Sequence, residues 1–336
     1  DSDPVVSIRK FNDWGWRIPF LVSILLVIVS IYIRLKMNES PLFAKLKAEG
    51  KTSVNPLKES FVHKANLKMV LLALFGATMG QGVVWYTGQF YAQNFIETVC
   101  KIDFGQSRTI LIWAILFATP FLAVLGSWSD KVGRKWIMLG GMLLAIIFYK
   151  PIYKQFLSLS DTTAYQAITP ASAGEPQVKR DTVANNIITT TSVKKIFTDG
   201  YAYTQKNVDT VFADLSKPVA QAPVMYIDKK LPAGTYWTFV FLVFVQVIFV
   251  TMVYGPIAAF LVEMFPTRIR YTSMSLPYHI GNGVFGGLTP FIALLLTTIN
   301  TGDKLGGLMY PIIVSAICFV IGALYVSNKI DPDVSD

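Results

Sequence analysis

The chain has 336 residues, of which 53% are hydrophobic and 15% charged, and its mean hydropathy is +0.47. Because a soluble domain carries about 25% charged residues, this composition argues against a soluble protein. The net charge is +9, and the basic residues cluster in loops between apolar segments, which indicates orientation in a membrane and excludes nucleic acid as the expected partner.

Seven apolar segments follow one another along the chain. Each is long enough to cross the hydrocarbon core of a bilayer, which takes about 20 residues, and their central parts contain no Asp, Glu, Lys or Arg. The segments are residues 16–35, 68–95, 108–128, 136–153, 236–264, 272–298 and 305–327. A soluble core does not need seven uncharged segments of this length. The sequence therefore predicts an all-α integral membrane protein with seven transmembrane helices in a lipid bilayer.

Basic residues are more frequent in one set of loops than in the other. The loops 36–68, 129–135 and 265–271 and the tail after residue 327 hold 13 Lys and Arg residues, whereas the short segments on the other side hold 6. Basic loops mark the cytoplasmic side of a membrane, so the first set is predicted to lie inside. The first helix then runs inward, and we expect further N-terminal helices of the same protein before residue 1.

The helices fall into two groups around a central loop. We expect residues 1–35 to hold the last helix of an N-terminal half and residues 36–67 to form a central cytoplasmic loop. Residues 68–153 and 235–328 would be the six helices of a C-terminal half, followed by a cytoplasmic tail at 329–336. One helix plus six fits transporters that are built from two six-helix halves.

Residues 154–234 form a polar insert that is predicted to lie on the extracytoplasmic side. In its second half, "VKKIFTDGYAYT" and "APVMYIDKKLPAGT" are β-branched and aromatic runs broken by Asp-Gly and Pro. These runs predict a few short strands in a partly folded cap, with disorder as the alternative. Ten basic residues from Lys150 to Lys230 stand against seven acidic ones, a balance that predicts no electrostatic funnel for a charged substrate.

Residues 126–135, "GSWSDKVGRK", concentrate charge between two apolar segments. Asp130 and Arg134 are four residues apart, the spacing of an ion pair on a helix. Gly126 is expected to allow close helix approach, and Gly133 can adopt backbone angles that other residues avoid. Lys135 belongs to the basic group that holds this loop inside. The alternative is a loop that only sets topology, but such a loop does not need two glycines and an Asp.

A second charged motif, "VEMFPTRIRYT", occupies residues 262–272. Glu263 lies at the end of an apolar segment, Pro266 is expected to end the helix, and Arg268 and Arg270 follow. This motif is predicted to lie on the same cytoplasmic face as residues 126–135. The spacing leaves open whether Arg268 or Arg270 is the partner of Glu263.

The first motif is similar to the G-x-x-x-D-x-x-G-R-[KR] signature of the major facilitator superfamily, and the second resembles its E-x-x-P-[ST]-x-x-R element. Residues 16–43 and 254–287 resemble the metabolite:proton symporter branch of that superfamily. The resemblance implies a bacterial inner membrane protein that takes up a small organic acid with protons by alternating access. A betaine- or proline-type osmolyte is the alternative substrate.

The resemblance also implies a latch and a missing proton carrier. The two charged loops would pair in the outward-open state and part when the inside opens, at the membrane surface where charges meet without the cost of burial. The central parts of the seven helices contain no Asp or Glu. The main proton carrier is therefore expected in the half that precedes this chain.

Polar side chains within apolar segments are candidates for a substrate path, because facing them to lipid is costly. One helix face shows such residues every four positions, with two tyrosines beside them: Gln81, Trp85, Gln89 and Gln93, flanked by Tyr86 and Tyr91. Amides can bind carboxylate or ammonium groups, and aromatic rings can meet a cation. Hydrogen bonding between helices is the alternative role.

Further candidates lie in the later helices. They are Tyr278, His279 and Asn282 and, with a weaker signal, Gln246 and Tyr254. His279 can join a proton relay, although a single His favours a bond to a neighbouring helix. Gly283 and Gly287 have the spacing for close helix packing.

Other functional classes lack their signatures. H-E-x-x-H, G-x-S-x-G and grouped carboxylates do not occur within the helices, so we expect no enzyme, no metal site and no cofactor. A retinal-binding seven-helix receptor requires a Lys in the middle of a late helix, and none is present. Cys100 and Cys318 form no motif and are expected to be unpaired thiols.

Overall fold

The computed structural model describes residues 4–37, 41–50, 53–183, 186–213, 218–299 and 302–327. The chain divides into two compact units, residues 1–54 and 55–336, which are described separately. Within the described residues, seven helices are long and apolar enough to cross a membrane. One lies in the first unit and six in the second, so the predicted number of spans is confirmed. The predicted tail 329–336 lies outside the described residues.

Four helical segments make up the described part of the first unit. They are α1 (Pro4–Asp13), the 3-10 turn η1 (Gly15–Arg17), α2 (Ile18–Lys36) and α3 (Pro41–Ala48). Proline occupies the first turn of α2, where a helix does not need its N–H. The α2 helix is apolar and has no buried residue, as expected of a helix whose neighbours are lipid or other membrane helices.

The first long helix of the second unit contains two wider turns. It follows the short helix α4 (Pro56–Val62) and consists of α5 (Lys64–Ala73), η2 (Leu74–Thr78), α6 (Met79–Tyr86), η3 (Thr87–Tyr91) and α7 (Ala92–Thr98). The segments η2 and η3 are π-helical. A π turn takes more residues than an α turn, so it shifts the directions in which all later side chains of the helix point around the helix axis. Residues four apart on the two sides of η3 therefore do not share one face.

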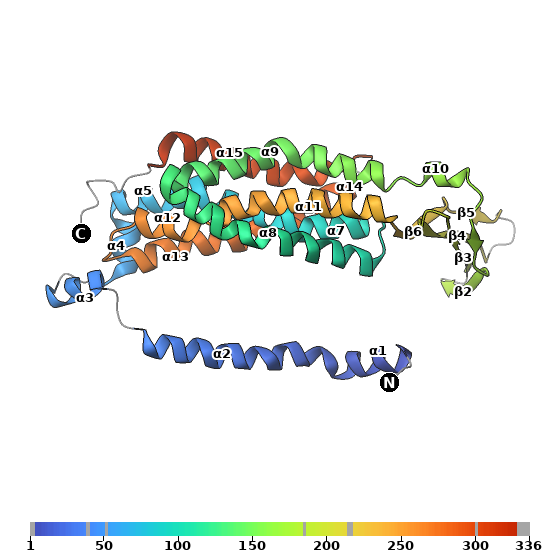
Figure 1. Ribbon diagram of the computed structural model, residues 1–336, viewed down its shortest axis with the longest axis horizontal. Coiled ribbons are helices and arrows are strands. Elements are labelled where there is room, and N and C mark those ends of the chain that lie inside the picture. Colours follow the sequence, from blue (N-terminus) through green and yellow to red (C-terminus); the bar gives the residue numbers. More distant parts are fainter. Residues whose placement is uncertain are drawn as a thin grey trace. The chain divides into compact units, whose positions relative to one another are not determined.

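Five further spans complete the bundle (Figure 1). They are α8 (Phe104–Val132); α9 (Arg134–Leu159); α11 (Ala233–Tyr254) with α12 (Ile257–Met264); α13 (Arg270–Ile280) with η4 (Gly281–Gly286) and α14 (Thr289–Ile299); and η5 (Gly306–Leu308) with α15 (Met309–Tyr325). The turns after α8 and α12 lie at one end of the bundle, and the insert lies at the other.

Small residues set the closest contacts between α6 and η4, as in many membrane bundles. A side chain at Gly82 would overlap the carbonyl oxygen of Gly281, and one at Gly286 would lie 2.9 Å from the Gly82 backbone. The prediction that Gly283 and Gly287 provide this packing is wrong, because a Cβ at Gly283 meets nothing within 4 Å. The π-helical η4 places Gly281 and Gly286, and not Gly283, against α6.

The insert folds as an antiparallel sheet. After α10 (Thr163–Gln166) come β1 (Ser172–Ala173), β2 (Gln177–Val183), β3 (Asn186–Ile196), β4 (Ala202–Val211), β5 (Ala220–Gln221) and β6 (Met225–Lys230). Strand β3 pairs with β1, β2 and β4, and β4 also pairs with β5 and β6. Figure 1 shows this sheet beyond the ends of α9 and α11.

An all-α fold class is therefore wrong for the insert, and the prediction of a few short strands in its second half underestimates the sheet. Strand β3 contains the run "IITTTSV", whose β-branched side chains favour an extended chain. The β3–β4 hairpin turns at the Asp-Gly pair: Gly200 has φ +86°, and the Asp199 carboxylate accepts from the Tyr201 N–H at 2.9 Å. The turn signal in the sequence is correct, but the strands are 11 and 10 residues long.

Candidate functional site

Three charged side chains meet at the end of the bundle that faces away from the insert. Arg134 Nη2 lies 3.1 Å from Asp130 Oδ1 at the end of α8 and 2.8 Å from Glu263 Oε1 at the end of α12. The Arg134 side chain is 23% exposed, and both carboxylates keep more than half of their surface exposed. One guanidinium thus joins the two charged motifs of the sequence. We call these three residues the charged triad.

Gly133 makes the turn that positions Arg134. It joins α8 to α9 with φ 104° and ψ 127°, angles that a residue with a Cβ avoids. Its N–H donates to the Ser129 carbonyl at 2.9 Å. A Cβ at Gly126 meets nothing within 4 Å, whereas one at Gly255 would lie 3.4 Å from the Leu122 carbonyl and 3.6 Å from the Gly126 nitrogen, so a close approach occurs here without depending on Gly126. The glycine that permits the approach is Gly255, which follows the last residue of α11.

Lys135 lies next to the charged triad but makes different contacts. Its Nζ donates to the carbonyl oxygens of Ala323 at 2.9 Å and Val326 at 2.6 Å, and the residue is 9% exposed. A cation at the end of α15 satisfies carbonyls that lack helical partners and offsets the negative end of the helix dipole. Lys135 therefore ties α9 to α15.

Neither Arg268 nor Arg270 is the partner of Glu263. Arg268 forms an ion pair with Glu59 on α4. The Arg270 Nε donates to the Phe265 carbonyl at 2.9 Å. Arg268 therefore attaches the loop between α12 and α13 to α4, and Arg270 attaches the start of α13 to the backbone of that loop.

Helix α4 docks on the same end of the bundle. The Asn55 side chain caps it by accepting from the Lys58 N–H at 3.0 Å, and proline follows the cap. Ser60 is fully buried and shares a 2.7 Å hydrogen bond with Ser273 on α13. Glu59 is thus a site residue that the sequence analysis missed, because its segment was expected to be a loop. The Asn-Pro cap was the available signal.

Gln81 and Asn282 meet between α6 and η4. Asn282 Nδ2 donates to Gln81 Oε1 at 3.0 Å. Gln81 is fully buried, and its Nε2 has no hydrogen-bond partner in the described part of the chain. Leaving a buried donor unpaired costs about 1–3 kcal/mol. Because the side chain is fully buried, a ligand or a water molecule can reach this N–H only when α6 and η4 move apart.

Five aromatic side chains gather near this amide pair. The Trp85 ring centroid lies 4.8 Å from Tyr86, 5.3 Å from Phe90 and 6.4 Å from Tyr254, on which it stacks. The Tyr278 hydroxyl lies 3.4 Å from the Tyr254 hydroxyl. All five are partly or well exposed, so their rings form an open surface, which we call the aromatic cluster. Ring faces of this kind attract cations.

The stripe of polar residues does not continue past η3 as one face. Gln93 lies against Arg108: in the amide orientation that pairs donors with acceptors, its oxygen accepts from Arg108 Nη1 and Nε at 2.8 Å. Tyr91 is buried and stacks on Tyr153 at 5.4 Å. Gln89 is half-buried, and its side-chain amide makes no hydrogen bond among the described residues. The π turn explains why the four-residue repeat misplaces these side chains.

Two other candidates differ in burial. His279 is exposed, its ring lies 5.8 Å from that of Tyr278, and it makes no hydrogen bond to a neighbouring helix in the described part of the chain. Gln246 is fully buried on α11, with Nε2 3.4 Å from the Leu242 carbonyl in its own helix. The bond between helices that a lone His favours is therefore not observed.

Within the residues that the structure describes, no group of three or more His, Cys, Asp or Glu side chains could hold a metal ion. Cys100 and Cys318 are free and buried. Burial raises the pKa of the Cys100 thiol, which lies between α7 and α8, to about 11. This thiol therefore stays protonated at neutral pH.

The seven apolar helices support a multi-pass membrane protein, and comparison with known proteins shows which proteins the chain resembles. The chain is 22% identical to the inner membrane metabolite transport protein YhjE of Escherichia coli over 294 residues, 86% of this chain and 49% of that protein. It is 25% identical to a putative metabolite transport protein of Haemophilus influenzae over 335 residues, 96% of this chain and 57% of that protein.

A putative proline/betaine transporter of Staphylococcus aureus is 21% identical over 320 residues, which cover 93% of this chain and 50% of that protein. No protein-family model and no solved structure matches the chain. The chain spans about half the length of the curated relatives it matches. The helices support a multi-pass membrane protein, and the relatives that the chain resembles are named as transport proteins.

Proposed function

We propose that this chain is the C-terminal half, with the preceding helix, of a secondary active transporter of the major facilitator type. It takes up a small organic acid together with protons by alternating access. The observation that carries this proposal is the charged triad, in which Arg134 joins Asp130 and Glu263 at one end of the bundle. The similarity to about half of each relative is consistent with it.

The charged triad suits a latch that opens in every cycle. Alternating access needs helix ends that pair in one state and part in the other. Exposed ion pairs are worth about 0.2–1 kcal/mol each, so a few of them bias a state without trapping it. The pair of Arg268 with Glu59 extends the same set of contacts to α4, which lies on the segment that leads to the rest of the protein.

The substrate surface is the amide pair together with the aromatic cluster. The unpartnered Nε2 of Gln81 is buried in this state and would donate to a carboxylate oxygen when the helices part during the transport cycle. Trp85 and Tyr254 present half-exposed rings beside it. In the proposed full protein this surface faces the other half, across a central cavity.

A betaine- or proline-type osmolyte is the second candidate substrate, and the aromatic cluster is the observation that favours it. Stacked rings recognise quaternary ammonium groups through cation–π attraction. The residues that form the cluster include no Lys or Arg to neutralise an organic acid. An organic acid would then take its positive partner from helices outside this chain.

Uptake by the full-length protein in proteoliposomes tests the proposal. With an inward proton gradient, we expect radiolabelled succinate to accumulate above equilibrium and a protonophore to abolish the accumulation. Accumulation of glycine betaine in place of succinate would select the second substrate. Absence of gradient-driven uptake of either compound by folded, inserted protein would contradict the proposal.

A further inference from the structure

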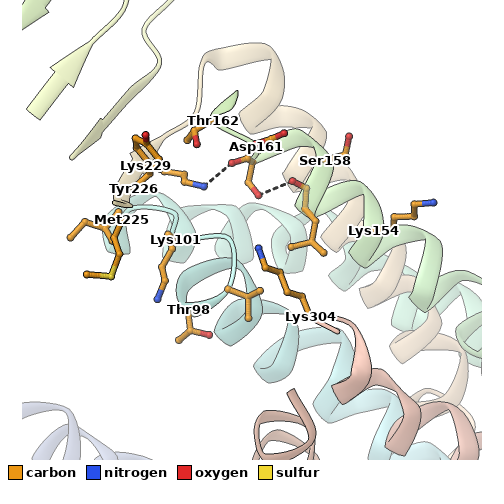
Figure 2. A pocket seen from close by; sticks show the side chains of 14 residues that line it. Thr98, Lys101, Lys154, Ser158, Asp161, Thr162, Met225, Tyr226, Lys229 and Lys304 are labelled. Atoms are coloured by element: carbon orange, nitrogen blue, oxygen red, sulfur yellow. Dashed lines mark hydrogen bonds between the residues drawn. The ribbon is translucent and has the colours of Figure 1, made fainter. Parts of the chain in front are cut away.

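A pocket of about 1080 Å³ opens where the sheet meets the ends of the helices. Its lining comes from α7, α9, β6 and the loops 99–103, 160–162 and 302–305 (Figure 2). Pockets for small ligands measure about 300–1,000 Å³, so the space is sufficient for a small metabolite. The pocket includes no residue of the charged triad or the aromatic cluster, and it is therefore a separate candidate site.

The pocket is strongly positive. Its charged lining residues are Lys101, Lys154, Lys229, Lys304 and Asp161. Four positive charges against one negative leave an excess of three. The single carboxylate is already engaged locally, because Asp161 Oδ1 accepts from Thr163 N at 3.1 Å and from Thr163 Oγ1 at 2.8 Å. In the described part of the chain, none of the four lysines forms an ion pair with a carboxylate.

Lys229 is the buried member of the set. It is 9% exposed, and its Nζ donates to the Ser160 carbonyl at 2.7 Å. Burial lowers the pKa of Lys229; the charges of Lys304 and Lys101 act in the same direction, whereas Cys100 and the Asp161 carboxylate oppose them in part. Like charges held together destabilise each other unless an opposite charge joins them. An anion in the pocket would remove this repulsion.

The backbone holds these lysines in place at some conformational cost. Lys101 and Asp228 have φ +60° and +49°, a region that residues other than glycine rarely adopt. Two hydrogen bonds join the segments: Lys229 N–H donates to the Lys101 carbonyl at 2.9 Å, and Asp103 N–H donates to the Lys229 carbonyl at 2.8 Å. Strained backbone that the surrounding structure fixes in this way is common at binding sites.

Hydroxyl groups add further donors. Ser158 and Tyr226 line the pocket, and their hydroxyls make no hydrogen bond among the described residues. Figure 2 shows Lys229 and Lys304 pointing toward the same space, from the strand and from the helix side, while Lys154 points outward at the rim. Ammonium and hydroxyl donors around one space suit a phosphate or carboxylate group.

We propose that this pocket binds a small oxyanion, a phosphate or carboxylate group, through Lys101, Lys229 and Lys304. The oxyanion is either a free solute or the headgroup of an anionic phospholipid, since the pocket lies at the ends of membrane helices. This site goes beyond the proposed transport function. Its binding can be measured whether or not uptake is observed.

The test uses the full-length protein in nanodiscs of phosphatidylcholine, with radiolabelled inorganic phosphate and succinate as probes in equilibrium dialysis. The variant K101Q/K304Q removes two exposed lysines and leaves the buried Lys229 in place. The matched control K194Q/K195Q removes the same charge from β3, outside the pocket. We expect K101Q/K304Q to lower the affinity for at least one probe about tenfold or more, the loss of charged hydrogen bonds, and the control to leave it unchanged.

An equal loss of probe affinity in K101Q/K304Q and K194Q/K195Q would show that only the net charge matters, and it would contradict the proposed site. Absence of saturable binding by the parent protein for both probes would also overturn it. Nanodiscs that contain phosphatidylglycerol distinguish the two sources of the oxyanion. If phosphatidylglycerol displaces the bound probe, and if this displacement requires Lys101 and Lys304, the oxyanion is a lipid headgroup. Binding that resists the lipid assigns a free solute, and either result upholds the oxyanion site.

Discussion

Arg134 and Lys135 are neighbours in sequence with different structural roles. The Arg134 guanidinium contacts two carboxylates at once, which its planar set of donors permits. The Lys135 ammonium instead binds two carbonyl oxygens at the end of α15. Substitutions at these two positions should therefore affect different properties, transport for Arg134 and stability for Lys135.

Replacing Lys135 with Met keeps the length of the side chain and removes its donors. We expect Lys135→Met to lower the free energy of unfolding by about 1–3 kcal/mol, because carbonyls at the end of α15 lose a charged partner. Lys131→Met, an exposed lysine at the end of α8, is the control and should have a smaller effect. Thermal unfolding of the full-length protein in detergent measures both. Equal unfolding temperatures for the two variants would contradict this role.

Gln81 and Trp85 are the residues on which the proposed substrate surface rests. Gln81→Ala and Trp85→Ala should each weaken substrate affinity about tenfold, the value of one hydrogen bond or one cation–π contact. Trp113→Ala on α8 is the control, since its ring contacts Phe117 and Trp237, away from the aromatic cluster. The Michaelis constant for uptake is the measurement. Unchanged affinity in both test variants would show that this face is not the substrate surface.

At the scale of elements, α4 connects the bundle to the segment that precedes it. Its docking rests on the Arg268–Glu59 ion pair and on the buried Ser60–Ser273 hydrogen bond. Two elements that are joined by a surface ion pair can be tested by reversing both charges.

Glu59→Lys should lower the uptake rate, because it places two like charges side by side at the end of α13. The double variant Glu59→Lys/Arg268→Glu should recover most of the lost rate. Lys58→Glu is the control, with a charge change of the same size at an exposed neighbour. Uptake that falls equally in the single and double variants would contradict a direct pair between these side chains.

The sheet of the insert is a separate element beyond the helix ends. Deleting about residues 160–228 and joining the ends with a short flexible linker should preserve membrane insertion and much of the uptake, because loops tolerate such changes. The same deletion should weaken oxyanion binding, because it removes Tyr226 from the pocket and also the Ser160 carbonyl and the β4 strand that hold Lys229 in place. Normal insertion with loss of substrate binding would identify the insert as a lid or a capture module.

For the whole molecule, the properties that the sequence predicts well are those set by short stretches of chain. The seven spans follow from uncharged segments of sufficient length, and the structure has helices in all seven. The Asp130–Arg134 spacing and the positive φ at Gly133 are local in the same sense. The β3–β4 turn at the Asp-Gly pair is a further example.

The properties that the sequence does not predict depend on contacts between distant segments. A π turn at η3 changes the helix face after Trp85, and no residue pattern marks such a turn. Glu59 and Lys135 have partners more than a hundred residues away in the chain. The positive pocket combines Lys229 of the insert with Lys101 and Lys304 from outside it, so a charge count over the insert alone predicts no such site.

The central claim is that the charged triad is a latch that transport requires. The most direct test is the initial uptake rate of full-length Asp130→Asn, compared with the parent protein at equal amounts in the membrane. We expect an initial rate that is lower by up to about fivefold, the equivalent of at most about 1 kcal/mol for a lost exposed ion pair, while Lys131→Gln beside it transports normally. An unchanged uptake rate for Asp130→Asn at normal membrane levels would contradict the claim.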